Sequence, residues 1–273
     1  MNKLNFNYGG GATRSLKAFT LAEVLITLAI IGVVAALTIP SVVANHKRNE
    51  IETSLKSSYS ILSNAFNLAI KDYGPTYTWS IEEKENQAQN AEAFFNKFFA
   101  PYLKIAKSCG TSTTSDCVYD FYSLGGGLFS FPAGNTSDHF SRFYLTNGMT
   151  ITALVATMNG KIHQLQLYVD TNGWKKPNKM GIDVQYFIIT LEKQDDPKRG
   201  YTLDSGTGDG TYAFMIQHTN FGCRKPLTAT SGTLGLACTL LLKSNGWKIP
   251  SVDEYVEMAG GDESYRALYP WNF

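Results

Sequence analysis

The longest apolar stretch of the chain runs from Phe19 to Ile39 and contains a single charged side chain, Glu23. As a helix with a rise of about 1.5 Å per residue, these positions would extend roughly 30 Å, which is the thickness of the hydrocarbon core of a bilayer. The pattern therefore predicts a helix long enough to span a membrane. Pro40 follows directly, and a proline there either kinks a helix or ends it.

Apolar residues continue to recur every three or four positions beyond Pro40, and the pattern stops at Gly74 and Pro75. This period predicts one helix over 19–73, with its second half packed on the rest of the chain. The alternative is two helices separated at Pro40, which would leave the remainder of the fold unchanged. The stripe consists of Ile51, Leu55, Tyr59, Leu62, Phe66, Ala69 and Tyr73.

A second helix is predicted over 91–105, after the polar stretch 81–90. Its aromatic residues have helical spacing, and we expect them to pack in the core rather than form a ligand surface. Pro101 is expected to end or kink this helix. The aromatic residues are Phe94, Phe95, Phe98, Phe99 and Tyr102.

The period changes to two over 142–169, where Asn-Gly pairs at 147 and 159 predict hairpin turns. Together with 183–192 and 211–216, this segment predicts an antiparallel meander. One face would cover the long helix and the other would be partly exposed. No repeat and no linker divides the rest of the chain, so the expected fold is α+β: a long N-terminal helix on an antiparallel sheet head, 74–273.

Charge adds a restriction on partners. The 273 residues carry 24 basic and 23 acidic side chains, and three of the basic ones, Lys3, Arg14 and Lys17, precede the apolar helix without any acid. The body that follows is close to neutral, so we expect no nucleic acid partner.

Four cysteines form two close pairs in the sequence, Cys109 with Cys117 and Cys223 with Cys238. An even number of cysteines behind a membrane segment favours an oxidising compartment and two local disulfides. The sequence alone allows three pairings as well as four free thiols. A metal site formed by these cysteines is disfavoured because no CxxC or His-rich spacing occurs.

Two processing routes fit the N-terminus. In the first, 24–39 is the apolar region of an ordinary secretory signal that is cut after Ala44, which would release a secreted cell-surface binding protein. Against this route, the apolar run exceeds the usual 7 to 15 or so residues, and Glu23 lies at its entrance.

The second route follows from a resemblance. The segment "AFTLAEVLITLAIIGVVAALTIP" resembles the cleavage and methylation segment of type IV pilins and type II secretion pseudopilins. The resemblance implies a leader, 1–18, removed by prepilin peptidase between Ala18 and Phe19, and an N-methylphenylalanine at Phe19. It also implies a pilin-like fold, with 19–73 as transmembrane and stalk helix. Ala18 departs from the family, which usually has Gly before the cut.

The same resemblance implies assembly roles for Phe19, Glu23 and Pro40. A charge at mid-bilayer costs about 2.5–3.5 kcal/mol on insertion scales, so it is retained mainly where it finds a partner. In pilin-like filaments that partner is the freed amine of Phe19 on a neighbouring subunit. The alternative is that Glu23, close to the end of the span, reaches the interface by itself.

One loop of the head collects oxygen-bearing side chains, Asp170, Asn172, Asn178 and Asp183, in a segment that resembles one common in prepilin-type proteins. Calcium takes six to eight oxygens, so these residues are a candidate calcium site, although the spacing is not that of an EF-hand. The alternative is a turn in which Asp and Asn bond to their own backbone. We expect no other cofactor.

The tail "ACTLLLKSNGWKIPSVDEY" also resembles the ends of large pilin-like proteins, and in this interpretation Cys238 would be bridged to Cys223. The scattered histidines and the absence of nucleophile or metalloprotease motifs disfavour an enzyme. We expect a structural subunit of a pilus or pseudopilus, of a minor or specialised kind given its large head. It would span the inner membrane once, with an extracytoplasmic head. The implied partners are other pilin or pseudopilin subunits, prepilin peptidase and the inner-membrane assembly platform.

Overall fold

A computed structural model describes residues 19–111, 117, 119–129, 140–191, 211–226 and 234–273. It divides into two compact units, Met1–Asn45 and His46–Phe273. Helix α1, Leu21–Tyr73, begins in the first unit and ends in the second, and it continues through Pro40. The prediction of one helix is therefore confirmed, and the alternative of two helices is not. Ala18 lies outside the described residues.

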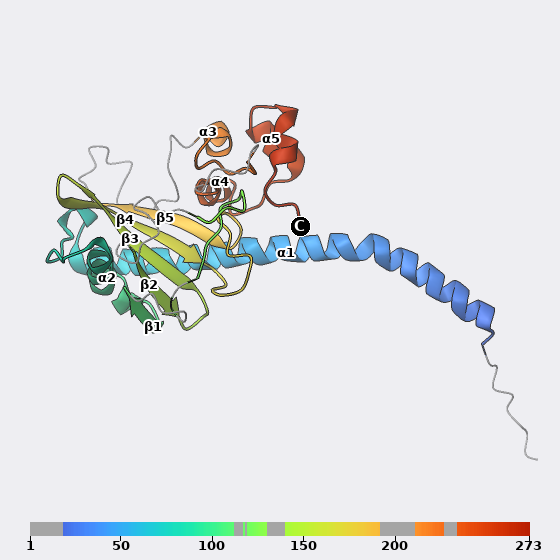
Figure 1. Ribbon diagram of the computed structural model, residues 1–273, viewed down its shortest axis with the longest axis horizontal. Coiled ribbons are helices and arrows are strands. Elements are labelled where there is room, and N and C mark those ends of the chain that lie inside the picture. The colour runs from blue at the N-terminus through green and yellow to red at the C-terminus, as the bar shows by residue number, and fades with distance from the viewer. Residues whose placement is uncertain (1–18, 112–116, 118, 130–139, 192–210, 227–233) are drawn as a thin grey trace, which may run out of the picture. The chain divides into compact units, whose positions relative to one another are not determined.

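The second unit is built around one five-stranded sheet with the order β1-β2-β3-β4-β5, in which all neighbouring strands are antiparallel (Figure 1). The α+β fold predicted from the sequence is thus confirmed. The strands are β1 Ile105–Gly110, β2 Phe140–Leu145, β3 Thr150–Met158, β4 Lys161–Asp170 and β5 Val184–Thr190.

The part of α1 that belongs to the second unit, 46–73, is called the stalk below. One face of the sheet carries the stalk and helix α2, Gln87–Phe98. Alternate residues of the strands, such as Ile151 and Phe187, point into this core, where Tyr59 of α1 has its ring 6.1 Å from that of Phe187. Of the five aromatic residues predicted to pack in the core, Phe94, Phe95, Phe98 and Phe99 are buried here, and Tyr102 is partly buried against the same core. Two short helices, η1 Thr76–Thr78 and η2 Ala100–Tyr102, flank α2.

The opposite face of the sheet is also covered, contrary to our expectation that it would be partly exposed. Leu154, Tyr168 and Tyr186 form a second core on this face. Phe121 and Phe129 from the loop before β2 pack against them. The sequence pattern missed this because the covering aromatics lie in an irregular segment with no period of its own.

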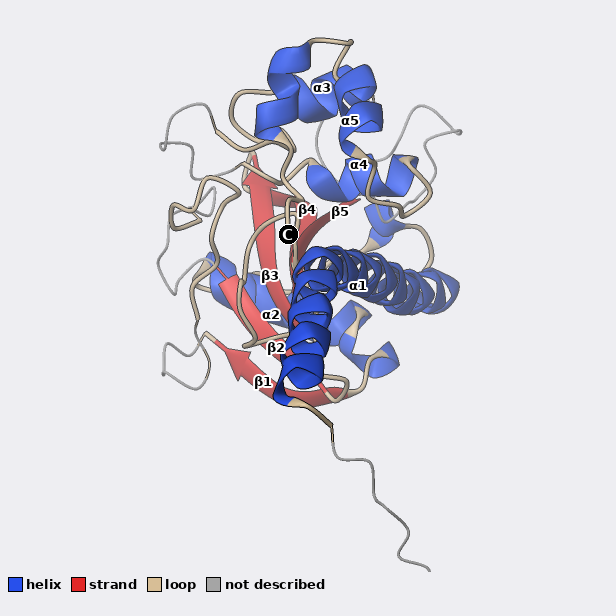
Figure 2. Ribbon diagram, turned by 90° about the vertical axis from the view of Figure 1, so that its right-hand side faces the viewer, coloured by secondary structure: helices blue, strands red, loops and turns tan. Residues whose placement is uncertain are grey.

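In the described residues after the sheet, the structure has the short helices α3 Tyr212–Gln217, α4 Cys238–Ser244, α5 Val252–Met258 and η4 Glu263–Leu268. They gather beyond β5 (Figure 2). The prediction of a strand over 211–216 is wrong, because Thr211 caps α3 by accepting a hydrogen bond from the N–H of Phe214 at 3.2 Å. Such a cap starts a helix even where aromatic residues favour a strand.

Candidate functional site

The first turn of α1 is closed by a reciprocal cap between Thr20 and Glu23. The Glu23 carboxylate accepts the backbone N–H and the hydroxyl of Thr20, each at 2.8 Å, and the N–H of Glu23 donates to the Thr20 hydroxyl at 3.2 Å. This capping box satisfies donors that a helix start leaves unpaired. It directs the carboxylate toward the end of the helix, next to Phe19.

The apolar side chains of α1 within the first unit are exposed. Phe19 is 84% exposed, and the most apolar window of the helix has a mean hydropathy of 2.4 with none of its residues buried. Within the described residues, α1 is the one helix long and apolar enough to cross a membrane. So large an apolar surface needs lipid or protein to cover it.

Glu52, in the stalk part of α1, binds the tail of the chain. Its side chain is almost buried, and its carboxylate accepts the backbone N–H of Ile249 at 2.9 Å and the ammonium of Lys248 at 2.6 Å. A buried carboxylate requires such donors, because an unpaired charge there would cost several kcal/mol. Through these two contacts, Glu52 attaches the stalk to Lys248 and Ile249, just before Pro250.

Arg48 binds the same segment from one turn earlier in α1. Its guanidinium donates to the carbonyl oxygens of Ile249 and Pro250, at 3.3 and 3.4 Å, and to the hydroxyl of Tyr269 at 3.1 Å. The Tyr269 hydroxyl in turn donates to the Pro250 carbonyl at 2.6 Å. Two opposite charges on one face of the helix thus bind successive peptide groups of the tail.

Aromatic packing completes this attachment. The Trp247 ring lies 4.5 Å from that of Tyr59, whose other neighbours are the ammonium of Lys243 and the ring of Phe187. We call this arrangement the C-terminal clamp: Arg48, Glu52 and Tyr59 of α1 with Trp247, Lys248, Ile249, Pro250 and Tyr269 of the tail. It holds the stalk helix, the tail and β5 in one orientation.

The loop 171–183 between β4 and β5 is organised by Asp183. Its two carboxylate oxygens accept the backbone N–H groups of Asn178 at 2.9 Å and Lys179 at 2.6 Å, and the Asn172 side chain approaches at 3.4 Å. Burial raises the pKa of Asp183, while the amide hydrogen bonds act in the opposite direction. Asp183 is therefore an internal cap for the loop.

Asp170 closes the other end of this loop. Its carboxylate accepts the Asn172 N–H at 3.1 Å and the Tyr119 hydroxyl at 2.9 Å. Burial, and next the charge of nearby Asp183, raise the pKa of Asp170 to about 7. Two carboxyl groups that are both buried and close together make ionisation of the pair unfavourable.

The structure thus brings together the four residues of the candidate calcium site. The carboxylates of Asp170 and Asp183 accept hydrogen bonds from the loop itself. When the Asn178 amide is assigned the orientation that satisfies its neighbours, its nitrogen donates to the carbonyls of Gly173 at 3.2 Å and Lys175 at 2.8 Å. This is the arrangement of the alternative turn interpretation. The described residues contain no group of three or more His, Cys, Asp or Glu side chains suited to a metal. Calcium binding stays a prediction.

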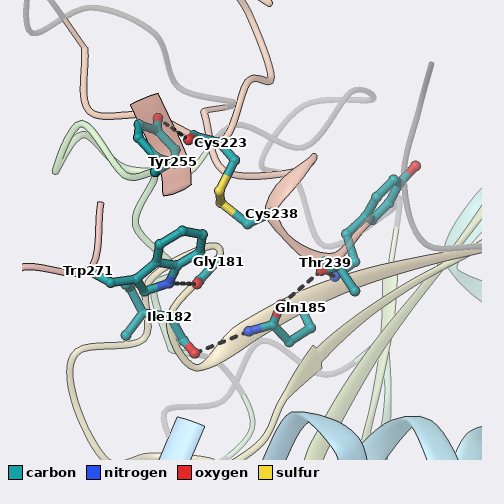
Figure 3. Close-up of a disulfide and its surroundings, with 9 residues drawn as sticks. Gly181, Ile182, Gln185, Cys223, Cys238, Thr239, Tyr255 and Trp271 are labelled. Carbon is teal, nitrogen blue, oxygen red and sulfur yellow. Dashed lines mark hydrogen bonds between the residues drawn. A yellow bond between two sulfur atoms is a disulfide. The ribbon is translucent and has the colours of Figure 1, made fainter. Parts of the chain in front are cut away.

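Gly181 connects this loop to the C-terminal region (Figure 3). It has a φ of +74°, and a Cβ there would lie 2.4 Å from the sulfur of Cys238, so only glycine fits. Its carbonyl accepts the indole N–H of Trp271 at 3.0 Å. Close by, the Tyr255 hydroxyl donates to the carbonyl of Cys223 at 2.7 Å.

Both disulfides in the structure have the local pairing that the sequence favoured, Cys109 with Cys117 and Cys223 with Cys238. Their Cα atoms are 5.7 and 4.6 Å apart, within the usual range for a disulfide. The second bridge joins the segment after α3 to the start of α4. It fixes the helix from which the tail leads into the clamp.

Sequence reasoning missed the clamp residues Arg48, Glu52 and Tyr269. Arg48 and Glu52 are four residues apart, so they share one helix face, yet ordinary solvated charges on a helix have the same spacing. The resemblance of the "NGWKIP" segment to other pilin-like tails was the one signal available, and it did not indicate what the tail binds.

Comparison with known families gives two matches. The model of a family of unknown function (DUF6613) matches residues 41–255, and the model of the prokaryotic N-terminal methylation motif matches residues 14–39. The second range contains Ala18, Phe19 and Glu23. No curated protein and no solved structure gives a significant match.

Proposed function

The chain belongs to a family of unknown function (DUF6613) and begins with the prepilin-type segment of type IV pilin-like proteins; from this premise we propose that it is a structural subunit of a type IV pilus or type II secretion pseudopilus filament. Proteins with this segment are structural rather than catalytic. The observation that carries the proposal is the methylation motif at 14–39 on a helix able to span a membrane.

Processing would precede assembly. Prepilin peptidase would remove the leader between Ala18 and Phe19, and methylation would follow at the new amine of Phe19. The helix would remain in the inner membrane, with the head on the extracytoplasmic side, until the assembly platform adds the subunit to a filament of sister pilins. The exposed apolar side chains of the first unit support this, because neighbouring helices in a filament would cover them.

Glu23 would then pair with the amine of Phe19 on the adjacent subunit. Its carboxylate accepts the N–H of Thr20 of the same chain and is exposed at the start of the helix, where the amine of a neighbouring subunit could reach it. An ion pair in a medium of low dielectric constant is strong, and it would set the axial register between helices. Pro40 would adjust the path of the helix near its exit from the membrane.

The mature N-terminus tests the processing step. Mass spectrometry of the purified protein is expected to give an N-terminal peptide that begins with methylated Phe19. A peptide that begins at Asn45 would instead support the secreted binding protein, and it would overturn the proposal. That cut would fall inside α1.

The Glu23→Ala variant tests assembly. Membrane insertion is expected to be preserved, since the substitution removes a cost of about 2.5–3.5 kcal/mol for a charge in lipid. Incorporation into filaments is expected to fall. Glu50→Ala is the matched control, because Glu50 is an exposed glutamate of the same helix beyond the apolar segment. Equal incorporation of the two variants would contradict the role of Glu23.

A further inference from the structure

A hollow of about 750 Å³ lies at the end of the sheet where β3 turns into β4. Buried Trp79 and Phe94 line it, together with Tyr77 and Met158, which are 42% and 49% exposed. Its volume is in the range of pockets that bind ligands or anchor side chains, which is roughly 300–1,000 Å³. An aromatic, half-open hollow of this kind is suited to an apolar side chain with a flat face.

The segment beside the hollow is acidic. Residues 81–85 contain three glutamates and one lysine, a net charge of −2, and their charged side chains are exposed. Lys84 pairs with Glu82 at 3.0 Å, and Glu83 belongs to the lining of the hollow. Lys161 lies on another wall. A partner with an aromatic group and positively charged side chains would complement the hollow and the acidic segment beside it.

Such a group is present on the same chain. Trp174 is 48% exposed and is followed by exposed Lys175 and Lys176. The indole is held by the rings of Tyr119, at 5.0 Å, and Tyr144, at 6.0 Å and nearly parallel. We call the exposed group 174–176, whose indole packs on these two rings in the loop that Asp183 caps, the Trp174 knob. Rigid aromatic residues of this kind are typical anchors of interfaces.

The knob and the hollow lie at opposite ends of the sheet. Residues at the start of β4, from Lys161 on, line the hollow, and the knob belongs to the loop that follows the last residue of β4, Asp170. Because Lys161, Ile162 and His163 line the hollow, seven residues of β4, 164–170, separate it from the loop, which is roughly 23 Å. One copy therefore cannot fill its own hollow, but a second copy placed head to tail can.

We propose that the Trp174 knob of one subunit enters the hollow of the next subunit, with Lys175 and Lys176 facing Glu82 and Glu83. The partner is a second copy of this chain, and the inference rests on the proposed filament function. A contact between two different surfaces is heterologous, and its repetition generates an open helical polymer when the rotation between neighbouring subunits does not close a ring. The head would thereby add a specific contact to the one made by the apolar helices.

Charge reversal in the full-length protein tests the contact. The Lys175→Glu/Lys176→Glu variant is expected to give roughly tenfold less filament, because like charges would meet at the rim. Adding Glu82→Lys and Glu83→Lys is expected to restore the yield. Lys104→Glu is the matched control, since Lys104 is also an exposed lysine of the head but lies outside the knob. The measurement compares the filament fraction with the membrane-inserted, disulfide-bonded pool, which also reports folding.

A photocrosslink identifies the occupant directly. A benzophenone amino acid in place of Trp174 is expected to join two copies of the chain, with the link mapped by mass spectrometry to 77–83 or 158–162. A link to another protein or to another surface overturns the inference. A normal filament yield in the Lys175→Glu/Lys176→Glu variant also overturns the inference. The same holds for a reduced yield that Glu82→Lys and Glu83→Lys do not restore. These outcomes leave the proposed function intact. A wild-type chain that never polymerises overturns both.

Discussion

Glu52 gives the most direct test of how the head is attached to the stalk. In Glu52→Ala, the N–H of Ile249 loses its acceptor in a site where Ile249 is only 5% exposed. A buried donor left without a partner costs about 1–3 kcal/mol. The Lys248 side chain is 69% exposed, so its ion pair adds at most about 1 kcal/mol. We therefore expect a total loss of about 1–4 kcal/mol of stability.

Glu52→Gln separates the two contributions. Its side-chain oxygen can still accept the Ile249 N–H, and only the charge is lost, so the expected cost is about 1 kcal/mol or less. Urea unfolding of the full-length protein in mild detergent, followed by Trp fluorescence, gives both values. If Glu52→Ala and Glu52→Gln lower the free energy of unfolding equally, the backbone hydrogen bond to Glu52 does not hold the tail. The same conclusion follows if Glu52→Ala lowers it by less than about 0.5 kcal/mol.

Two further predictions concern the loop 171–183. The pKa of Asp170 is raised to about 7 in the folded state, so this state keeps a proton that the unfolded chain releases near pH 4. Stability should therefore fall as the pH rises from about 4 to 7, by up to about 4 kcal/mol. Asp170→Asn should flatten this dependence in unfolding curves measured across that range, and an unchanged slope would contradict the assignment. Gly181→Ala should cost about 2–4 kcal/mol and impair formation of the Cys223–Cys238 disulfide, measured by thiol labelling. Gly148→Ala, with φ of +87° and no atom within 4 Å of the added Cβ, should show the backbone cost alone, about 1 kcal/mol; equal effects at both glycines would exclude the contact with Cys238.

The strands that alternate in sequence were the easiest part of the sheet to predict. The Asn-Gly pairs at 147 and 159 mark the turns that begin and end β3, and alternate residues of β3 and β4 face the two cores. β1 was missed because its exposed residues, Ala106 to Ser108, show no alternation. An edge strand with irregular pairing gives no periodic signal.

Some features of the candidate sites could also be predicted from the sequence, and others could not. Cys223 and Cys238 were paired from their spacing, and the loop residues Asp170 to Asp183 were recognised as one group. The role of Asp183 as a cap could not be predicted, because it depends on which backbone N–H groups the loop brings to its carboxylate. The hollow beside Trp79 could not be predicted either, since its walls come from segments about 80 residues apart.

The sequence by itself determined a helix long and apolar enough to span a membrane, the prepilin-type N-terminus with Phe19 and Glu23, and the fold class. These properties depend on residues that are contiguous in the chain, and they can be recognised from hydrophobicity, helical period and a short motif. Only the tertiary structure decided that both faces of the sheet are buried, that Arg48 and Glu52 bind the tail, and that the Trp174 knob and the hollow lie at opposite ends of the sheet. Such features depend on distances between residues far apart in the chain, and no local pattern contains them.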